Sequence, residues 1–136
     1  MDLSITITPI EGRVGAKAET FNCFYDADIA LHTHSKIHNA PERGNGYLKT
    51  GVSVTLDGLN YEFRYDMVAG GADSDGLGLY PDLRKTLINR LRFYAGQKCP
   101  RHMEPEAYQA FLDTYVNEEM KQRCAALLDK LEELNK

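Results

Sequence analysis

Residues 47–66 read YLKTGVSVTLDGLNYEFRYD, and this stretch decides the fold that the sequence predicts. Apolar and polar residues alternate over 47–56, and aromatic and charged residues alternate over 61–66. A side-chain period of two is typical of a strand with one buried face. Asp57-Gly58 between the two segments predicts a two-residue turn, because Gly readily adopts the positive φ that such a turn needs. We therefore predict a β-hairpin.

The second strand of this hairpin has two chemically different faces. Tyr61, Phe63 and Tyr65 alternate with Glu62, Arg64 and Asp66. Because the charged face suits solvent, we predict that the aromatic face lies in the core. The alternative is an open aromatic face, which would form a patch able to stack nucleic-acid bases.

Outside the hairpin, the same patterns predict one further strand and three helices. Alternation predicts a strand, helical spacing predicts helices, and clusters of Gly, Pro and Asp predict loops. The elements are strand 3–9, helix 23–38, loop 39–46, loop 68–78, helix 80–96 and helix 104–135. The order β-α-β-β-α-α predicts an α+β fold, with a small antiparallel sheet and helices packed on one face.

The length of 136 residues predicts a single domain, 1–136, with 97–136 as a candidate C-terminal helical extension. A straight helix over 104–135 would span about 48 Å, which exceeds the roughly 36–40 Å expected for the domain. One solution is a break near Val116-Asn117, with the second half packed inside the monomer on Leu83, Leu87 and Leu91. The other is a homodimer through a coiled-coil seam. That seam would comprise Met120, Cys124, Leu127, Leu131 and Leu134.

Composition places the chain among ordinary folded proteins. Hydrophobic residues make up 43% and charged residues 26%, which argues against intrinsic disorder. No segment is apolar for long enough to span a membrane, and the first residues lack the layout of a signal peptide. The three cysteines form no pairing motif, which is typical of a reducing compartment. We therefore expect a cytoplasmic protein that does not bind membranes.

Charge is unevenly distributed along the chain. Residues 57–83 carry one basic and six acidic side chains, whereas residues 84–101 carry six basic side chains and no acid. The basic side chains are Arg84, Lys85, Arg90, Arg92, Lys98 and Arg101. They either neutralise the acidic segments of the same molecule or contact phosphates of a nucleic acid.

No pattern predicts a catalytic or metal site. His32, His34 and His38 lie on one predicted helix, and the last two share a face, but a metal site needs three or four ligands. The sequence around Asp73 and Asp75 lacks the remaining ligands of a calcium loop. We therefore interpret these groups as solvated surface and expect no enzymatic activity, no bound metal and no cofactor.

Residues 39–50 (NAPERGNGYLKT) and 52–67 (VSVTLDGLNYEFRYDM), together with the helix end LRFYAG at 91–96, carry a family resemblance. Over about residues 29–96 the chain resembles the large polyvalent protein-associated domain of type twenty-five, a module of phages and mobile elements. The resemblance implies a protein that counters host defences, of the anti-CRISPR or antirestriction type, without a catalytic residue set.

Two functions are consistent with these observations. The first is a non-enzymatic inhibitor that binds a host defence protein or nucleoprotein complex, with acidic side chains occupying a basic nucleic-acid channel. The alternative is a nucleic-acid-binding accessory module that uses the basic segment 84–101. The predicted binding residues for the two functions together are Asp57, Glu62, Arg64, Asp66, Asp73, Asp75, Arg84, Lys85 and Arg92.

Overall fold

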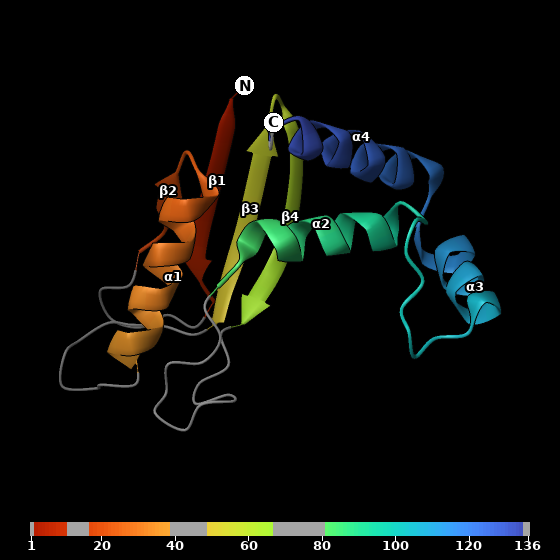
Figure 1. Cartoon of the computed structure of the whole chain (residues 1–136), viewed down its shortest axis with the longest axis horizontal. Coiled ribbons are helices and arrows are strands. Elements are labelled where there is room, and N and C mark those ends of the chain that lie inside the picture. The colour runs from red at the N-terminus through yellow and green to blue at the C-terminus, as the bar shows by residue number, and fades with distance from the viewer. Residues whose placement is uncertain (1, 11–16, 39–48, 67–80, 135–136) are drawn as a thin grey trace. The chain divides into compact units, whose positions relative to one another are not determined.

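The computed structural model describes residues 2–10, 17–38, 49–66 and 81–134 (Figure 1). The predicted loops 39–46 and 68–78 lie outside the described residues. The chain divides into two compact units, which we call the sheet unit (residues 2–83) and the helical unit (residues 84–136). The division into compact units falls between Leu83 and Arg84, and the single domain 1–136 with 97–136 as a candidate extension stays a prediction.

The sheet unit contains a four-stranded antiparallel sheet, which confirms the predicted α+β class. The strands are β1 (Leu3–Pro9), β2 (Glu19–Phe21), β3 (Lys49–Leu56) and β4 (Leu59–Asp66), in the order β2-β1-β3-β4. The sequence did not predict β2. It has only three residues, too few to show an alternating pattern, and pairing with β1 from Ile5 to Ile7 defines it.

The predicted hairpin turn is confirmed in detail. Asp57 and Gly58 have φ values of 49° and 84°, so both central residues are left-handed, as a type I′ turn requires. Asp57 also anchors the start of β1. Its backbone N–H donates to the Asp2 carbonyl at 2.9 Å, and its Oδ1 accepts from the Asp2 N–H at 2.9 Å.

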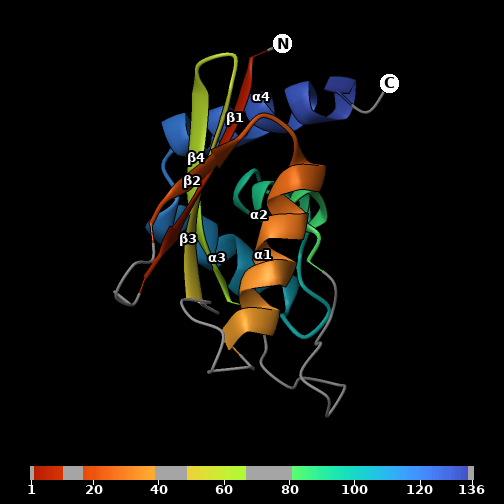
Figure 2. The same cartoon turned by 90° about the vertical axis from the view of Figure 1, so that its left-hand side faces the viewer.

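One face of the sheet forms the core of the sheet unit. In cross-strand register, Val52 lies between Ile7 and Phe63, and all three are buried. Tyr61 and Tyr65 share this face and are half-buried, which agrees with the prediction that the aromatic side of β4 faces inward. The helix α1 (Phe24–His38) lies beside β1 and β2, as Figure 2 shows.

The helical unit consists of three helices, of which the first begins at the boundary with the sheet unit. They are α2 (Leu83–Tyr94), α3 (Pro105–Tyr115) and α4 (Glu118–Leu134). Gly96 ends α2, as predicted, with a φ of 77°. The Gln97 N–H donates to the Arg92 carbonyl at 2.8 Å and the Gly96 N–H to the Phe93 carbonyl at 3.2 Å, which is a Schellman motif.

The predicted last helix is two helices, because the chain breaks at Val116-Asn117. Val116 is extended (φ −120°, ψ 109°), and the Asn117 side chain caps α4 by accepting from the Met120 N–H at 2.8 Å. The predicted break near Val116-Asn117 is thus confirmed, whereas packing of the second half on Leu83, Leu87 and Leu91 stays a prediction. Leu127 and Leu131 of α4 are buried, as are Leu87 and Leu91 of α2. Within the described ranges, no helix is long and apolar enough to cross a membrane.

Candidate functional site

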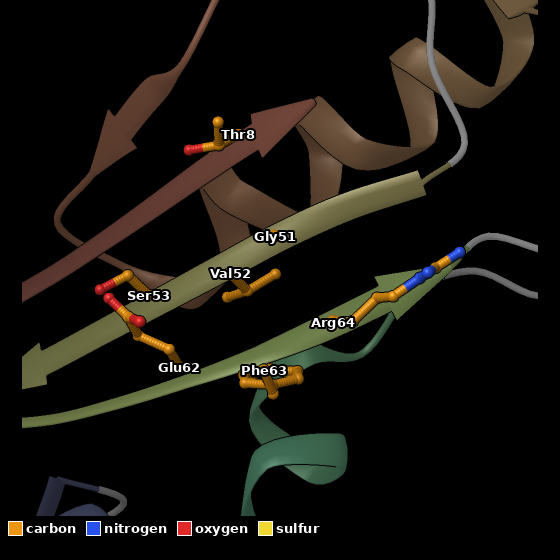
Figure 3. Close-up of a pocket in the computed structure, with 7 residues that line it drawn as sticks. All are labelled: Thr8, Gly51, Val52, Ser53, Glu62, Phe63 and Arg64. Carbon is orange, nitrogen blue, oxygen red and sulfur yellow. The ribbon is translucent and has the colours of Figure 1, made fainter. Parts of the chain in front are cut away.

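The face of the sheet opposite the core is exposed and carries a hollow, which we call the open sheet face. In cross-strand register, Gly51 lies between Thr8 and Arg64. Because Gly51 has no side chain, a depression of about 390 Å³ forms among its neighbours (Figure 3). Ser53 and Glu62 from the adjacent row complete its polar edge.

Several side chains of the open sheet face are held by hydrogen bonds to neighbouring side chains. The Arg64 Nε donates to both carboxylate oxygens of Asp66 at 2.9 Å. The Asn60 Nδ2 donates to the hydroxyls of Ser53 and Thr55, each at 2.9 Å. Side chains ordered in advance lose less conformational entropy when a partner binds. The face is therefore suited to a partner that recognises fixed polar groups.

The structure brings together part of the set of charged residues that was predicted for binding around the hairpin. Glu62, Arg64 and Asp66 are exposed on the outer side of β4, as predicted. Asp57 instead lies at the hairpin turn, where it is bonded to Asp2. Asp73 and Asp75 lie outside the described residues.

Of the three predicted binding residues on α2, which are Arg84, Lys85 and Arg92, two contact α4. The Arg84 Nη2 donates to the Leu131 carbonyl at 3.3 Å, in the last turn of the helix, where carbonyls have no helical partner. Arg92 forms an ion pair with Glu132 at 3.6 Å. Lys85 is exposed. These contacts hold α2 to α4, so Arg84 and Arg92 have structural partners inside the helical unit.

The sequence prediction missed a cluster of aromatic rings in the helical unit. The Phe93 ring lies 5.1 Å from Tyr94, 5.2 Å from Tyr108 and 5.4 Å from Phe111, measured between centroids. Phe111 in turn lies 5.1 Å from Tyr115. The i,i+4 spacing of Phe111 and Tyr115 was the available signal, but only the fold shows that Phe93 and Tyr94 of α2 join the rings of α3.

Hydrogen bonds within the protein hold His34 and Cys99, and Cys124 is buried. The His34 Nε2 lies 2.6 Å from the Glu19 Oε2, which joins α1 to β2. Burial raises the pKa of the Cys124 thiol, so it stays protonated. The Cys99 thiol donates to the Met103 carbonyl at 3.3 Å. No group of three or more His, Cys, Asp or Glu in the described part of the chain could hold a metal ion. The side chain of His38 lies outside the described residues.

Asp28 is a titratable group that sequence reasoning did not single out. Its Oδ1 accepts from the Leu83 N–H at 3.0 Å and so caps the first residue of α2. Burial raises the pKa of Asp28 to about 6, and the nearby charge of Asp82 contributes. Burial also raises the pKa of Tyr65, on the same side of the sheet unit. No local pattern could show this contact, because Asp28 and Leu83 are 55 positions apart in the sequence.

Comparison of the chain with protein-family models, with curated proteins and with solved structures finds no match. The resemblance of residues 29–96 to the large polyvalent protein-associated domain therefore stays a prediction.

Proposed function

We propose that this protein is a phage or mobile-element accessory protein that inhibits a host defence system by binding a protein of that system. The proposal takes its target class from the family resemblance and its mode of action from the open sheet face. The observation that carries it is the hollow at Gly51, edged by ordered polar side chains from three strands.

The charge of the sheet unit supports a target with a basic surface. Residues 2–83 carry six Lys and Arg against twelve Asp and Glu, a net charge of −6. Glu62 and Asp66 lie on the open sheet face itself. Acidic surfaces accelerate association with basic ones and discourage other partners. The nucleic-acid channel of a defence effector is such a surface.

The test is a plaque assay in cells that carry one defined CRISPR or restriction system. Expression of the wild-type protein should restore plaque formation by a targeted phage. Gly51→Gln fills the hollow, and an added Cβ meets only the Thr8 carbonyl oxygen at 3.8 Å, an ordinary contact. We expect this variant to lose at least about tenfold of the protection, because a side chain in the hollow prevents a group of the partner from entering it.

The control is Thr33→Gln, which adds the same side chain at an exposed position of α1 and should protect like the wild type. Titration of the purified target separates binding from catalysis, because a binder inhibits at about one molecule per target. Complete inhibition far below that ratio would establish an enzyme and contradict the proposal. Equal protection by Gly51→Gln and the wild type would exclude the open sheet face.

A further inference from the structure

We propose that the helical unit binds single-stranded nucleic acid through an aromatic surface formed by Phe93, Tyr94, Phe111 and Tyr115. This surface lies wholly within residues 84–136, whereas the open sheet face lies within residues 2–83. The inference therefore goes beyond the proposed inhibition and does not depend on it.

A second hollow, of about 390 Å³, marks one end of the aromatic surface. It lies along α2 and is lined by Thr86, Asn89, Arg90, Phe93 and Tyr94. Two aromatic rings, two neutral polar side chains and one guanidinium thus meet at one depression. Flat rings beside hydrogen-bonding groups match a nucleobase, which has an apolar face and polar edges.

The rings continue from this hollow to the solvent. Tyr94 lies 6.5 Å from Phe111, and Phe111 lies 5.1 Å from Tyr115, measured between ring centroids. Tyr115, at the end of this row, is 72% exposed. Successive rings that end in an exposed one provide a platform on which unpaired bases can stack.

Cations lie beside the rings, where phosphates of a stacked strand would pass. Arg90 lines the hollow, and the Lys98 Nζ lies 3.1 Å from the Oδ1 of Asn89, another lining residue. Residues 84–101 contain no acidic side chain. On α3, Asp113 is two residues from both Phe111 and Tyr115, which places it on a different side of the helix, and it accepts from the Gln109 side chain at 2.9 Å.

These features favour a single-stranded nucleic acid over two other partners, a nucleic-acid duplex and an acidic peptide. In a duplex the bases are stacked on one another, so their faces cannot reach the rings. An acidic peptide would pair with Arg90 and Lys98 but would make no use of an exposed ring face at Tyr115. Rings and cations together are the pattern of proteins that bind single strands with little sequence preference.

The test uses the full-length protein and a fluorescein-labelled dT12 oligonucleotide, with fluorescence anisotropy at 50 mM NaCl. We expect a dissociation constant on the order of 10 µM, in the range of sequence-independent binding. Tyr115→Ala should weaken binding about tenfold, because one stacked base is lost. The matched control is Tyr25→Ala on α1, where the ring is 69% exposed, and it should bind like the wild type.

Salt dependence tests the role of the cations. Arg90→Gln should reduce the slope of log K against log[salt] by about 0.7, the value for one phosphate contact on a single strand. Arg123→Gln, at an exposed position of α4, is the control and should leave the slope unchanged. Circular dichroism establishes that all four variants are folded before binding is measured.

Three results would overturn the inference. The first is absence of dT12 binding at 100 µM protein, and the second is unchanged binding by Tyr115→Ala. The third is equal affinity for a 12-base-pair duplex. Binding of a labelled peptide rich in Asp and Glu tests the alternative that the surface recognises an acidic peptide. If Tyr115→Ala abolishes binding of the peptide while dT12 does not bind, the surface recognises a protein.

Discussion

The sheet unit and the helical unit differ in the sign of their net charge and in the side chains that line their hollows. The sheet unit has a net charge of −6, whereas the helical unit carries ten Lys and Arg against eight Asp and Glu, a net charge of +2. The hollow of the sheet unit forms where Gly51 lacks a side chain among hydroxyls and charges. The hollow of the helical unit is lined by Phe93 and Tyr94.

The two proposals therefore assign one surface in each unit to a different class of partner. Strands hold short polar side chains at fixed spacing, which suits recognition of polar groups on a protein. Helices hold aromatic side chains three and four residues apart, which brings rings into a row. The formal charge of the whole chain, −4, describes neither surface, because each unit has its own charge.

The largest expected effect concerns the core of the helical unit. Leu127 is fully buried within a single chain. Leu127→Ala should lower the free energy of unfolding by about 2–5 kcal/mol, because the substitution leaves a cavity. Urea unfolding followed by circular dichroism measures this loss. Val54→Ala, at a fully buried position of β3, is the matched change in the sheet unit and removes two carbon atoms where Leu127→Ala removes three.

The burial of Leu127 also bears on the homodimer, the second solution that the coiled-coil pattern offered. Cys124, Leu127 and Leu131 are buried in one chain, so a second copy is not needed to cover them. We therefore expect light scattering to give the mass of a monomer at tens of micromolar protein. A dimeric mass, with an unfolding midpoint that rises with protein concentration, would contradict this expectation.

Prediction from sequence succeeded where the pattern was local. The alternation of residues 47–66, the Asp57-Gly58 turn and the helix end at Gly96 each depend on residues close in sequence. It failed for β2, which exists because β1 pairs with it, and it gave no sign of the boundary between the compact units at Leu83. A short strand and a unit boundary depend on contacts that no local pattern reports.

The candidate sites show the same limit. Alternation placed Glu62, Arg64 and Asp66 on the outer face of β4 correctly. It could not show that Gly51 would lie opposite Thr8 and Arg64, because register between strands is a tertiary property. The charge count of residues 84–101 found Arg84 and Arg92 but not their partners on α4.

The next effect, of intermediate size, is a pH dependence of stability that we expect from the sheet unit and not from the helical unit. The pKa of Asp28 is about 6 in the folded sheet unit, against an ordinary value of 3.8. The folded state thus binds this proton more tightly than the unfolded state, so the stability that Asp28 contributes is highest below pH 4. That stability is lost as the pH rises through 6. In the helical unit, the raised pKa values of Cys124 and Tyr108 start from 9.0 and 10.0, so neither group titrates in this window.

Asp28→Asn should therefore stabilise the protein at pH 7, because an amide keeps an oxygen for the Leu83 N–H without a buried charge. The side chain is half-buried and water screens part of the effect, so we expect a gain of about 1 kcal/mol. The gain should disappear near pH 4, where the wild-type carboxyl is protonated. Thermal unfolding at pH 4, 5.5 and 7 measures it, and a gain independent of pH would assign it to packing instead.

The smallest expected effect concerns two exposed ion pairs, one in each unit. Arg64 pairs with Asp66 and Arg92 pairs with Glu132, and all four side chains are about half exposed. Pairs of this kind contribute about 0–1 kcal/mol, because water and salt screen them. Arg64→Gln and Arg92→Gln should thus leave the free energy of unfolding almost unchanged. The two variants can then report on function without a change in stability. If Arg64→Gln loses phage protection and Arg92→Gln keeps it, the inhibitory surface lies on the sheet unit. The reverse pattern would locate it on the helical unit and contradict the role proposed for the open sheet face.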